Sequence, residues 1–147
     1  NINMKLFFLL LLKFIFITNA YSNDEYIISS FATHTSNEIE TSKGYKFSTS
    51  EAIGNWIDNK GNYGKSKIIF YVEKFNTTTS IKGLGEFIDQ ENKKIWLIPE
   101  RETEQDAGVG TINIIDASNK YTFLIDKKCF YAINYLDDRS FLKVKCN

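Results

Sequence analysis

The chain is poor in several residue types that carry chemistry. Its 147 residues include one His, two Cys, one Pro and one Met, and acidic and basic residues balance at 18 each. A single His excludes a His-based metal cluster, and we expect neither a metal nor a cofactor. A chain without net charge has no overall field to hold nucleic acid, so we expect no nucleic-acid partner.

Long apolar runs are also scarce, and the one present lies at the start. A basic start at Lys5 precedes apolar residues 6–17, which are interrupted only by Lys13, and small residues lead to Ala20. This layout is typical of a secretory signal peptide. The run is shorter than the roughly 20 residues that span a bilayer, and Lys13 argues against an uncleaved anchor.

We therefore expect residues 1–20, with residues 1–3 upstream of the start, to be a signal peptide that is cut after Ala20 or Ser22. Residues 21–147 are then one exported domain, periplasmic or secreted, in a bacterium. Lys outnumbers Arg 16 to 2, which indicates an AT-rich genome. No second long apolar run follows, so we expect no stable membrane span after cleavage.

The exported domain consists of short β-type runs separated by polar turns. β-Branched and aromatic residues concentrate in Lys67–Glu73, Lys94–Ile98, Thr111–Ile115 and Tyr121–Ile125, and earlier strands are expected at Ile27–Phe31 and Tyr45–Trp56. Turn-forming clusters lie at Asp58–Asn62, Asp89–Asn92 and Asp116–Asn119. The best helix candidate is Asn37–Ser42. This spacing predicts an all-β, single-domain antiparallel barrel of about eight strands, with a β-sandwich as the alternative.

The last hairpin can be predicted residue by residue. If Asp137-Asp138 form a two-residue turn, facing residues have numbers that sum to 275, and Cys129 lies opposite Cys146. The same register gathers apolar residues on one face, with Tyr131 among them. Directly opposed residues are within disulfide reach, so we expect a structural Cys129–Cys146 disulfide and not a redox or metal pair.

For the remaining candidate catalytic, metal-binding and ligand-binding residues, structural roles are the better interpretation. His34 could act as a general base for a Ser or Thr nucleophile, but no nucleophile motif surrounds it. The alternating acidic residues Glu100, Glu102, Glu104 and Asp106 could form a calcium site or an acid/base pair, although a charged loop or edge strand is the better interpretation. Gly83-x-Gly85 and Gly108-x-Gly110 lack the other residues of phosphate loops and are more typical of strand curvature. Trp56 and Trp96 are weak candidates for lining a ligand cavity, and core positions are the alternative.

Two segments resemble known proteins. The segment from Gly54 to Gly64 is similar to one that recurs in small exported proteins of unknown function from AT-rich marine bacteria. The stretch from Gly108 to Tyr131 resembles the closing strands of allene-oxide-cyclase-like and dirigent-like barrels. The resemblance implies an eight-stranded antiparallel barrel with an internal cavity, of the calycin type. It identifies no catalytic residue in this chain.

Three functions are compatible with the sequence. We expect an exported barrel that binds a small apolar or amphipathic ligand, because aromatic residues are abundant and no catalytic group is assembled. The second hypothesis is an envelope interaction or structural protein that uses an exposed strand or aromatic patch. The third is a cyclase- or isomerase-like enzyme, which we rank last.

Overall fold

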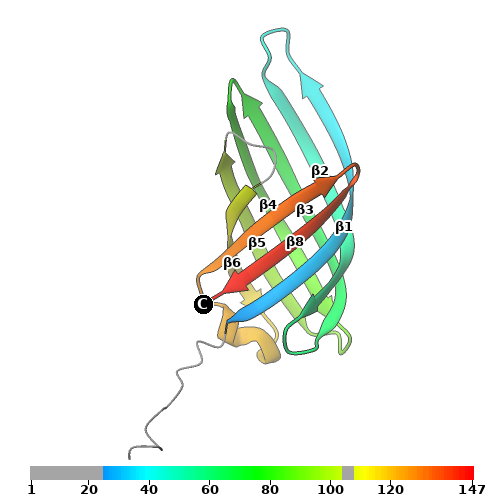
Figure 1. Ribbon diagram of the computed structural model, residues 1–147, viewed down its shortest axis with the longest axis vertical. Helices are drawn as coiled ribbons and strands as arrows, with labels where there is room; N and C mark the ends of the chain where they lie inside the picture. Colours follow the sequence, from blue (N-terminus) through cyan, green and yellow to red (C-terminus); the bar gives the residue numbers. More distant parts are fainter. Residues whose placement is uncertain (1–24, 104–107) are drawn as a thin grey trace, which may run out of the picture.

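The computed structural model describes residues 25–103 and 108–147, which form one closed antiparallel barrel (Figure 1). Each strand pairs with the next along the chain, and β8 pairs with β1 to close the barrel. The eight strands are β1 (Tyr26–Glu40), β2 (Lys46–Asp58), β3 (Tyr63–Phe75), β4 (Thr78–Asp89), β5 (Lys94–Thr103), β6 (Gly108–Ala117), β7 (Cys129–Leu136) and β8 (Arg139–Cys146). The predicted barrel is confirmed, and the sandwich alternative is wrong.

Inward and outward residues alternate along the strands, so half of each strand contributes to the interior. The buried side chains gather toward the end of the barrel that carries the β2–β3 and β4–β5 turns, which is called the lower end here (Figure 1). This core consists mainly of large apolar side chains, among them Tyr26, Ile28, Trp56, Phe87, Ile95, Leu97, Tyr121, Leu124 and Val144.

The predicted strand at Tyr121–Ile125 is wrong. Residues Asn119–Leu124 form η1, a 3-10 helix between β6 and β7. Tyr121 and Leu124 are both fully buried, and a spacing of three residues places two side chains on the same face of a 3-10 helix. The apolar residues of this segment therefore serve a helical turn that closes the lower end of the barrel.

The predicted helix at Asn37–Ser42 is also wrong. Residues 37–40 complete β1 and pair with residues 46–49 of β2. These residues are exposed, because β1 and β2 extend beyond the end of the β1–β8 ladder at Thr33 and Arg139. With no apolar face to bury, this part of β1 lacks the alternation that identifies a strand in sequence.

The turns predicted at Asp58–Asn62 and Asp89–Asn92 are confirmed, and the structure shows that both have the same construction. Asp58 ends β2 and Asp89 ends β4, and each carboxylate accepts hydrogen bonds from the backbone N–H groups two and four residues later, all at 2.8 Å. The residue in left-handed conformation is Gly61 (φ +87°) in the first turn and Asn92 (φ +60°) in the second. These are residue types that tolerate that conformation.

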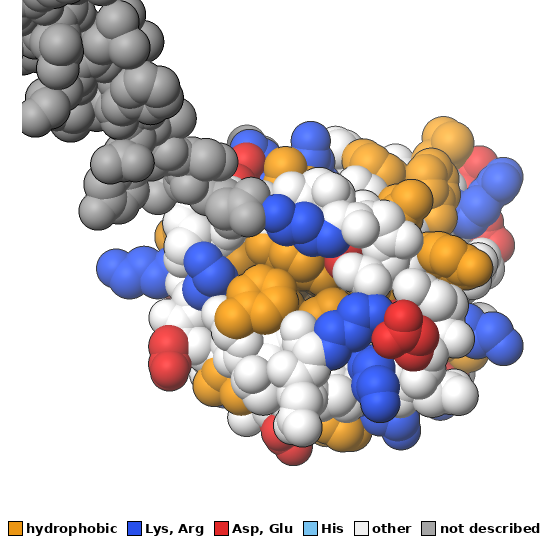
Figure 2. Space-filling model, turned by 90° about the horizontal axis from the view of Figure 1, so that it is seen from below, with side chains coloured by type: hydrophobic (Ala, Val, Ile, Leu, Met, Phe, Trp, Pro, Cys, Tyr) orange, Lys and Arg blue, Asp and Glu red, His pale blue; other side chains and the backbone are white. Residues whose placement is uncertain are grey.

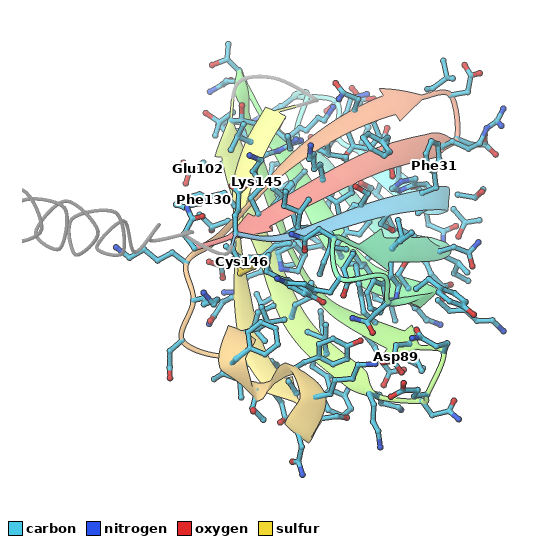
Figure 3. All side chains as sticks on the ribbon, turned by 60° about the horizontal axis from the view of Figure 1, so that its bottom comes forward. Phe31, Asp89, Glu102, Phe130, Lys145 and Cys146 are labelled. Carbon is cyan, nitrogen blue, oxygen red and sulfur yellow. A yellow bond between two sulfur atoms is a disulfide. The ribbon has the colours of Figure 1, made fainter. Side chains whose placement is uncertain are left out.

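Each of these aspartates also anchors a buried tyrosine. The Tyr26 hydroxyl donates to Asp58 at 2.5 Å, and the Tyr121 hydroxyl donates to Asp89 at 2.7 Å. Asp89 lies at the same end of the barrel as η1 (Figure 3). Viewed from below, side chains fill this end, with hydrophobic groups near its centre and basic groups around them (Figure 2). The lower end is therefore closed.

The final hairpin has the predicted register. Cys129 pairs with Cys146, and the pairing continues without interruption to Leu136 and Arg139. Cys129 and Cys146 form a disulfide, with their Cα atoms 4.1 Å apart. Asp137 adopts a left-handed conformation at the turn (φ +56°), which Asp tolerates better than most residues.

Several predictions fall on residues that the structure does not describe. The expected signal peptide, residues 1–20, lies outside the described residues, as do Glu104 and Asp106. Glu100 and Glu102 belong to β5, where Glu100 pairs with Lys82 of β4, so the predicted edge strand is an interior strand of the closed sheet. Within residues 25–103 and 108–147, no helix has the length and hydrophobicity to cross a membrane.

Candidate functional site in the barrel lumen

The upper part of the lumen contains two adjoining cavities. The deeper one, called the chamber, has a volume of about 50 Å³, and the outer one, called the vestibule, has a volume of about 280 Å³. The inward residues of β1 follow this order: Tyr26 and Ile28 lie in the core, Ser30 and Ala32 line the chamber, and Ser36 lines the vestibule. The residues that line both cavities, and so mark the passage between them, are His34, Phe70, Ile81 and Tyr135.

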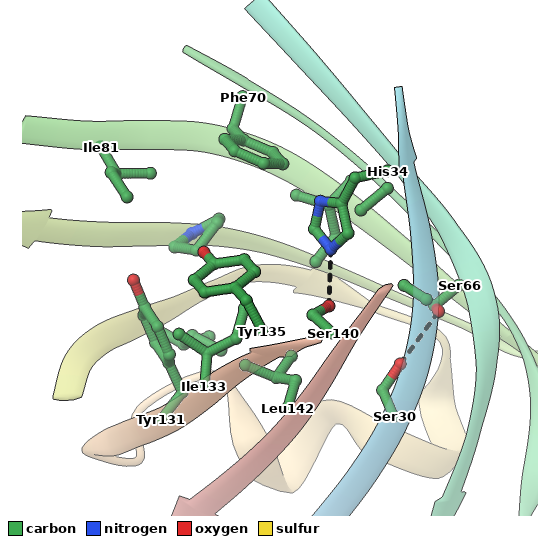
Figure 4. A pocket seen from close by; sticks show the side chains of 15 residues that line it. Ser30, His34, Ser66, Phe70, Ile81, Tyr131, Ile133, Tyr135, Ser140 and Leu142 are labelled. Atoms are coloured by element: carbon green, nitrogen blue, oxygen red, sulfur yellow. Dashed lines mark hydrogen bonds between the residues drawn. The ribbon is translucent and has the colours of Figure 1, made fainter. Parts of the chain in front are cut away.

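The chamber wall is mostly apolar (Figure 4). Its apolar lining includes one residue from each of the eight strands: Ala32, Ala52, Ile68, Ile81, Pro99, Ile112, Ile133 and Leu142. About 10–15 Å³ of such volume is needed for one water-sized group, so the chamber has room for roughly three to five of them. It suits a small apolar fragment rather than a whole lipid chain.

Polar groups in the lumen occur as hydrogen-bonded pairs. Ser30 and Ser66 bond in the chamber at 3.2 Å, and Ser36 and Ser50 bond in the vestibule at 2.6 Å. The third pair joins Nε2 of His34 to Oγ of Ser140 at 2.6 Å (Figure 4). Buried hydroxyls normally have such partners, so hydrogen bonding alone does not distinguish a functional pair from a structural one.

The His34 imidazole is held by β1 and by two aromatic neighbours. Its ring meets those of Phe70 and Tyr135 edge-on, with centroids 6.0 and 5.7 Å away. Its backbone N–H donates to the carbonyl of Asp138 at 2.7 Å, which fixes this part of β1 beside the β7–β8 turn. Burial lowers the pKa of His34, and the charge of Asp138 opposes this effect only in part. The ring is therefore neutral near pH 7 and can accept a proton.

The vestibule is more polar than the chamber and carries both signs of charge. Lys74 and Arg101 line it together with Glu38 and Asp137. Arg101 is the deepest of these groups, since only 5% of its surface is exposed. Several hydroxyl groups complete the lining, from Ser36, Ser48, Ser50 and Thr79. The arrangement offers hydrogen bonds to a polar group that enters from above.

Tyr131 lies on the chamber wall and stays protonated. Burial raises the pKa of its hydroxyl to about 12, although the positive charge of Arg101 acts in the opposite direction. A phenol with this pKa is a neutral hydrogen-bond donor at every physiological pH. At the closed end of the lumen, Asp58 and Asp89 are ionised and hydrogen-bonded, because hydrogen bonds outweigh burial and lower the pKa of each carboxyl.

Neither tryptophan named from the sequence lines the chamber or the vestibule. Trp56 lies in the lower core, where its indole N–H donates to the carbonyl of Lys65 at 3.1 Å and it packs on Phe87. Trp96 is only partly buried, and its indole N–H donates to Glu86 at 3.0 Å. The 15 residues around the chamber include no tryptophan, and its aromatic lining is Phe70, Tyr131 and Tyr135.

Sequence reasoning missed Ser140 and Arg101 as lumen residues. His34 and Ser140 are 106 positions apart and meet only because β8 closes onto β1. A lone Arg in a strand whose alternate residues are apolar was a signal, since Arg101 follows the inward positions Leu97 and Pro99. Among the described residues, no three His, Cys, Asp or Glu side chains cluster so as to hold a metal ion.

Comparison with known proteins identifies the fold but no family. No protein-family model matches the chain, and no curated protein matches it. A protein of unknown function from Clostridium acetobutylicum ATCC 824 aligns with a TM-score of 0.64 at 12% identity, covering 83% of this chain and 96% of that one. A conserved protein of unknown function from Rhodopseudomonas palustris gives 0.68 at 10% identity, covering 82% and 94%.

An enzyme from Penicillium herquei has a TM-score of 0.64 at 11% identity, covering 82% of this chain and 90% of that one. At these identities the three structures share the barrel fold with this chain, and a shared fold does not transfer an activity. They therefore support the eight-stranded architecture alone, without confirming a relation to allene-oxide-cyclase-like or dirigent-like proteins.

Proposed function

We propose that the protein is an exported barrel that binds a small amphipathic molecule in its lumen. The apolar part occupies the chamber, and the polar part lies in the vestibule near Arg101. The observation that carries this proposal is the change in lining along one continuous lumen, from apolar side chains at the chamber to charged and hydroxyl groups above it. Small-molecule sites commonly combine an apolar cavity with a few polar groups that fix orientation.

Two further features support the proposal. The lower end is closed by η1 and the two aspartate turns, so a ligand would enter and leave through the upper end. The Cys129–Cys146 disulfide accords with an oxidising compartment, where the signal-like start of the chain would direct it.

The proposal is tested by native mass spectrometry with straight-chain carboxylates from butanoate to decanoate. Each buried methylene contributes about 0.8 kcal/mol, so affinity should rise about fourfold per carbon until the chamber is full and then stop rising. Ala52→Phe should abolish binding, because Ala52 is buried and lines the chamber. Ala132→Phe is the matched control on the exposed face of β7. Equal binding by the wild type and Ala52→Phe would refute a site in the lumen.

A second candidate function, association through the barrel exterior, is favoured by a band of exposed apolar residues. Phe31 pairs with Phe141 across β1 and β8, and Ile69 pairs with Leu84 across β3 and β4. Ile53 of β2 lies between them, and these side chains are between 37% and 63% exposed. Contiguous exposed apolar surface often marks an interaction site. Cross-linking in the native host with wild type and Phe31→Ser would test this function, which predicts a partner band that the variant loses.

A further inference from the structure

His34 and Ser140 differ from the other polar pairs of the lumen. The Ser30–Ser66 and Ser36–Ser50 pairs each join two hydroxyls, which cannot activate one another. In the third pair, a hydroxyl lies 2.6 Å from Nε2 of an imidazole, which is hydrogen-bonding distance for a nucleophile and its general base. The chain has a single His, and this is where it lies.

The two side chains also face different parts of the lumen. Ser140 lines the chamber and not the vestibule, whereas His34 lines both. A carbonyl carbon that approaches Ser140 from the vestibule would place its acyl group in the chamber. Its leaving group would remain beside His34, at the passage to the vestibule. The chamber volume of about 50 Å³ limits the acyl group to a few carbon atoms.

We propose that Ser140 and His34 are a nucleophile and general base that cleave esters of short-chain acids inside the lumen. This inference rests on the proposed function in that the ester must enter the same cavity, but it adds a reaction that a simple binding protein would not have. The polar alcohol portion of the ester occupies the vestibule, and the acyl portion occupies the apolar chamber.

The reaction needs only the ester, water and these two side chains. Ser140 Oγ forms a bond to the acyl carbon while its proton passes to His34 Nε2. The ester C–O bond then breaks, and the departing alcohol oxygen takes that proton. Water attacks the acyl-Ser140 ester and gives a proton to Nε2, which returns it to Ser140 Oγ as the carboxylic acid is released.

His34 is suited to this role by its surroundings as well as by its distance. The edge-on contacts with Phe70 and Tyr135 restrict rotation of the imidazole, and the hydrogen bond to Asp138 fixes its backbone. Burial favours the neutral ring, which is the form that accepts a proton. Ser140 is itself buried, with 4% of its surface exposed, so bulk water does not compete for its hydroxyl.

The experiment is p-nitrophenyl butyrate hydrolysis by the purified, disulfide-bonded protein at pH 7.5. The wild type should release nitrophenolate faster than buffer alone, and acid quenching should trap a butyryl group that peptide mass spectrometry maps to Ser140. Ser140→Ala should abolish both signals. His34→Gln should slow nitrophenolate release at least ~100-fold, the usual contribution of a general base.

Thr33→Ala is the matched control, because Thr33 precedes His34 on β1 but is exposed and lines neither the chamber nor the vestibule. It should retain the wild-type rate, and thermal melting should show that all variants fold. A wild-type rate equal to that of buffer, or an unchanged rate in Ser140→Ala, would overturn the inference. The wild-type adduct map tests it even if His34→Gln does not fold, since a butyryl group only on other residues also overturns it.

The two proposals can fail separately. If Ala52→Phe abolishes carboxylate binding but no hydrolysis depends on Ser140, the binding function is supported and the esterase proposal is wrong. If hydrolysis depends on Ser140 and His34 but native mass spectrometry shows no bound carboxylate, the protein is an esterase and the proposed binding function is wrong.

Discussion

The Tyr121 hydroxyl donates a 2.7 Å hydrogen bond to Oδ2 of Asp89, which ties η1 to the turn after β4. Lys120 contacts the same oxygen at 2.8 Å, and the Asp89 side chain is completely buried. Burial raises the pKa of this carboxyl, but hydrogen bonds from Lys120, the backbone N–H of Lys93 and Tyr121 outweigh it and lower the pKa to about 2. The closed end of the barrel therefore depends on an ionised aspartate.

Acid should weaken the fold through this group. The pKa of Asp89 is lower in the folded chain than its ordinary value of 3.8, so its contribution is fully present above about pH 4 and is lost as the pH falls toward 2. The shift corresponds to roughly 2 kcal/mol. Urea unfolding between pH 7 and pH 2 should show this loss in the wild type and a smaller one in Asp89→Asn. The matched control is Asp126→Asn, which removes an exposed aspartate that follows η1.

Removing either buried hydroxyl should destabilise the lower end to a similar extent. Tyr26→Phe and Tyr121→Phe each remove one hydrogen bond to a charged aspartate oxygen, which we expect to cost about 1–3 kcal/mol in the free energy of unfolding. Chemical denaturation at pH 7 measures both. Tyr63→Phe serves as the control, because Tyr63 is 58% exposed and should change stability by less than about 0.5 kcal/mol. A loss in only one of the two variants would contradict the equivalence of the turns.

Reducing the disulfide should lower stability moderately. Cys129 and Cys146 are 17 positions apart, a loop length for which closure entropy gives roughly 3 kcal/mol. The two strands are already joined by a tight turn, so we expect about 2–3 kcal/mol. Denaturant midpoints with and without dithiothreitol measure this difference. The Cys129→Ala/Cys146→Ala double variant should have the midpoint of the reduced protein, and dithiothreitol should not change it.

Gly110 should tolerate no side chain. A Cβ at this position would lie 2.5 Å from the Tyr131 ring and 2.6 Å from the Glu100 carbonyl oxygen, so β6 or the chamber wall would have to move. We expect Gly110→Ala to cost about 1–3 kcal/mol. Gly108→Ala is the matched control on the same strand, where no described residue beyond the chain neighbours lies within 4 Å of the added Cβ. Thermal unfolding of the two variants should differ by several degrees, and equal melting temperatures would refute the close approach.

The sequence predicted the parts of the fold that local chemistry determines. The C-terminal register followed from Asp137-Asp138 at the turn together with alternating polarity, and the structure confirms it pair by pair. Tyr121–Ile125 was misassigned because a short apolar run is compatible with a strand or a helical turn. The choice depends on the rest of the barrel. The strands alone would leave its lower end uncovered, and Tyr121 helps to close that end by donating a hydrogen bond to Asp89.

The candidate site was harder to predict than the fold. His34 was recognised as a possible base, but its partner depends on the closing β1–β8 ladder, which joins residues more than 100 positions apart. The tryptophans stood out in the sequence by size, whereas the chamber is lined by smaller residues on inward positions of all eight strands. Which inward positions are filled and which are left open depends on packing of the whole barrel.

The order of the strands has a consequence for the speed of folding. In the described chain, every ladder except β1–β8 joins strands that are consecutive in sequence, so most of the sheet can form through short-range contacts. The β1–β8 ladder must instead bring together residues separated by most of the chain, which carries a larger loop-closure entropy. Barrel closure, and with it the meeting of His34 with Ser140, is expected to be the late and rate-limiting event in folding.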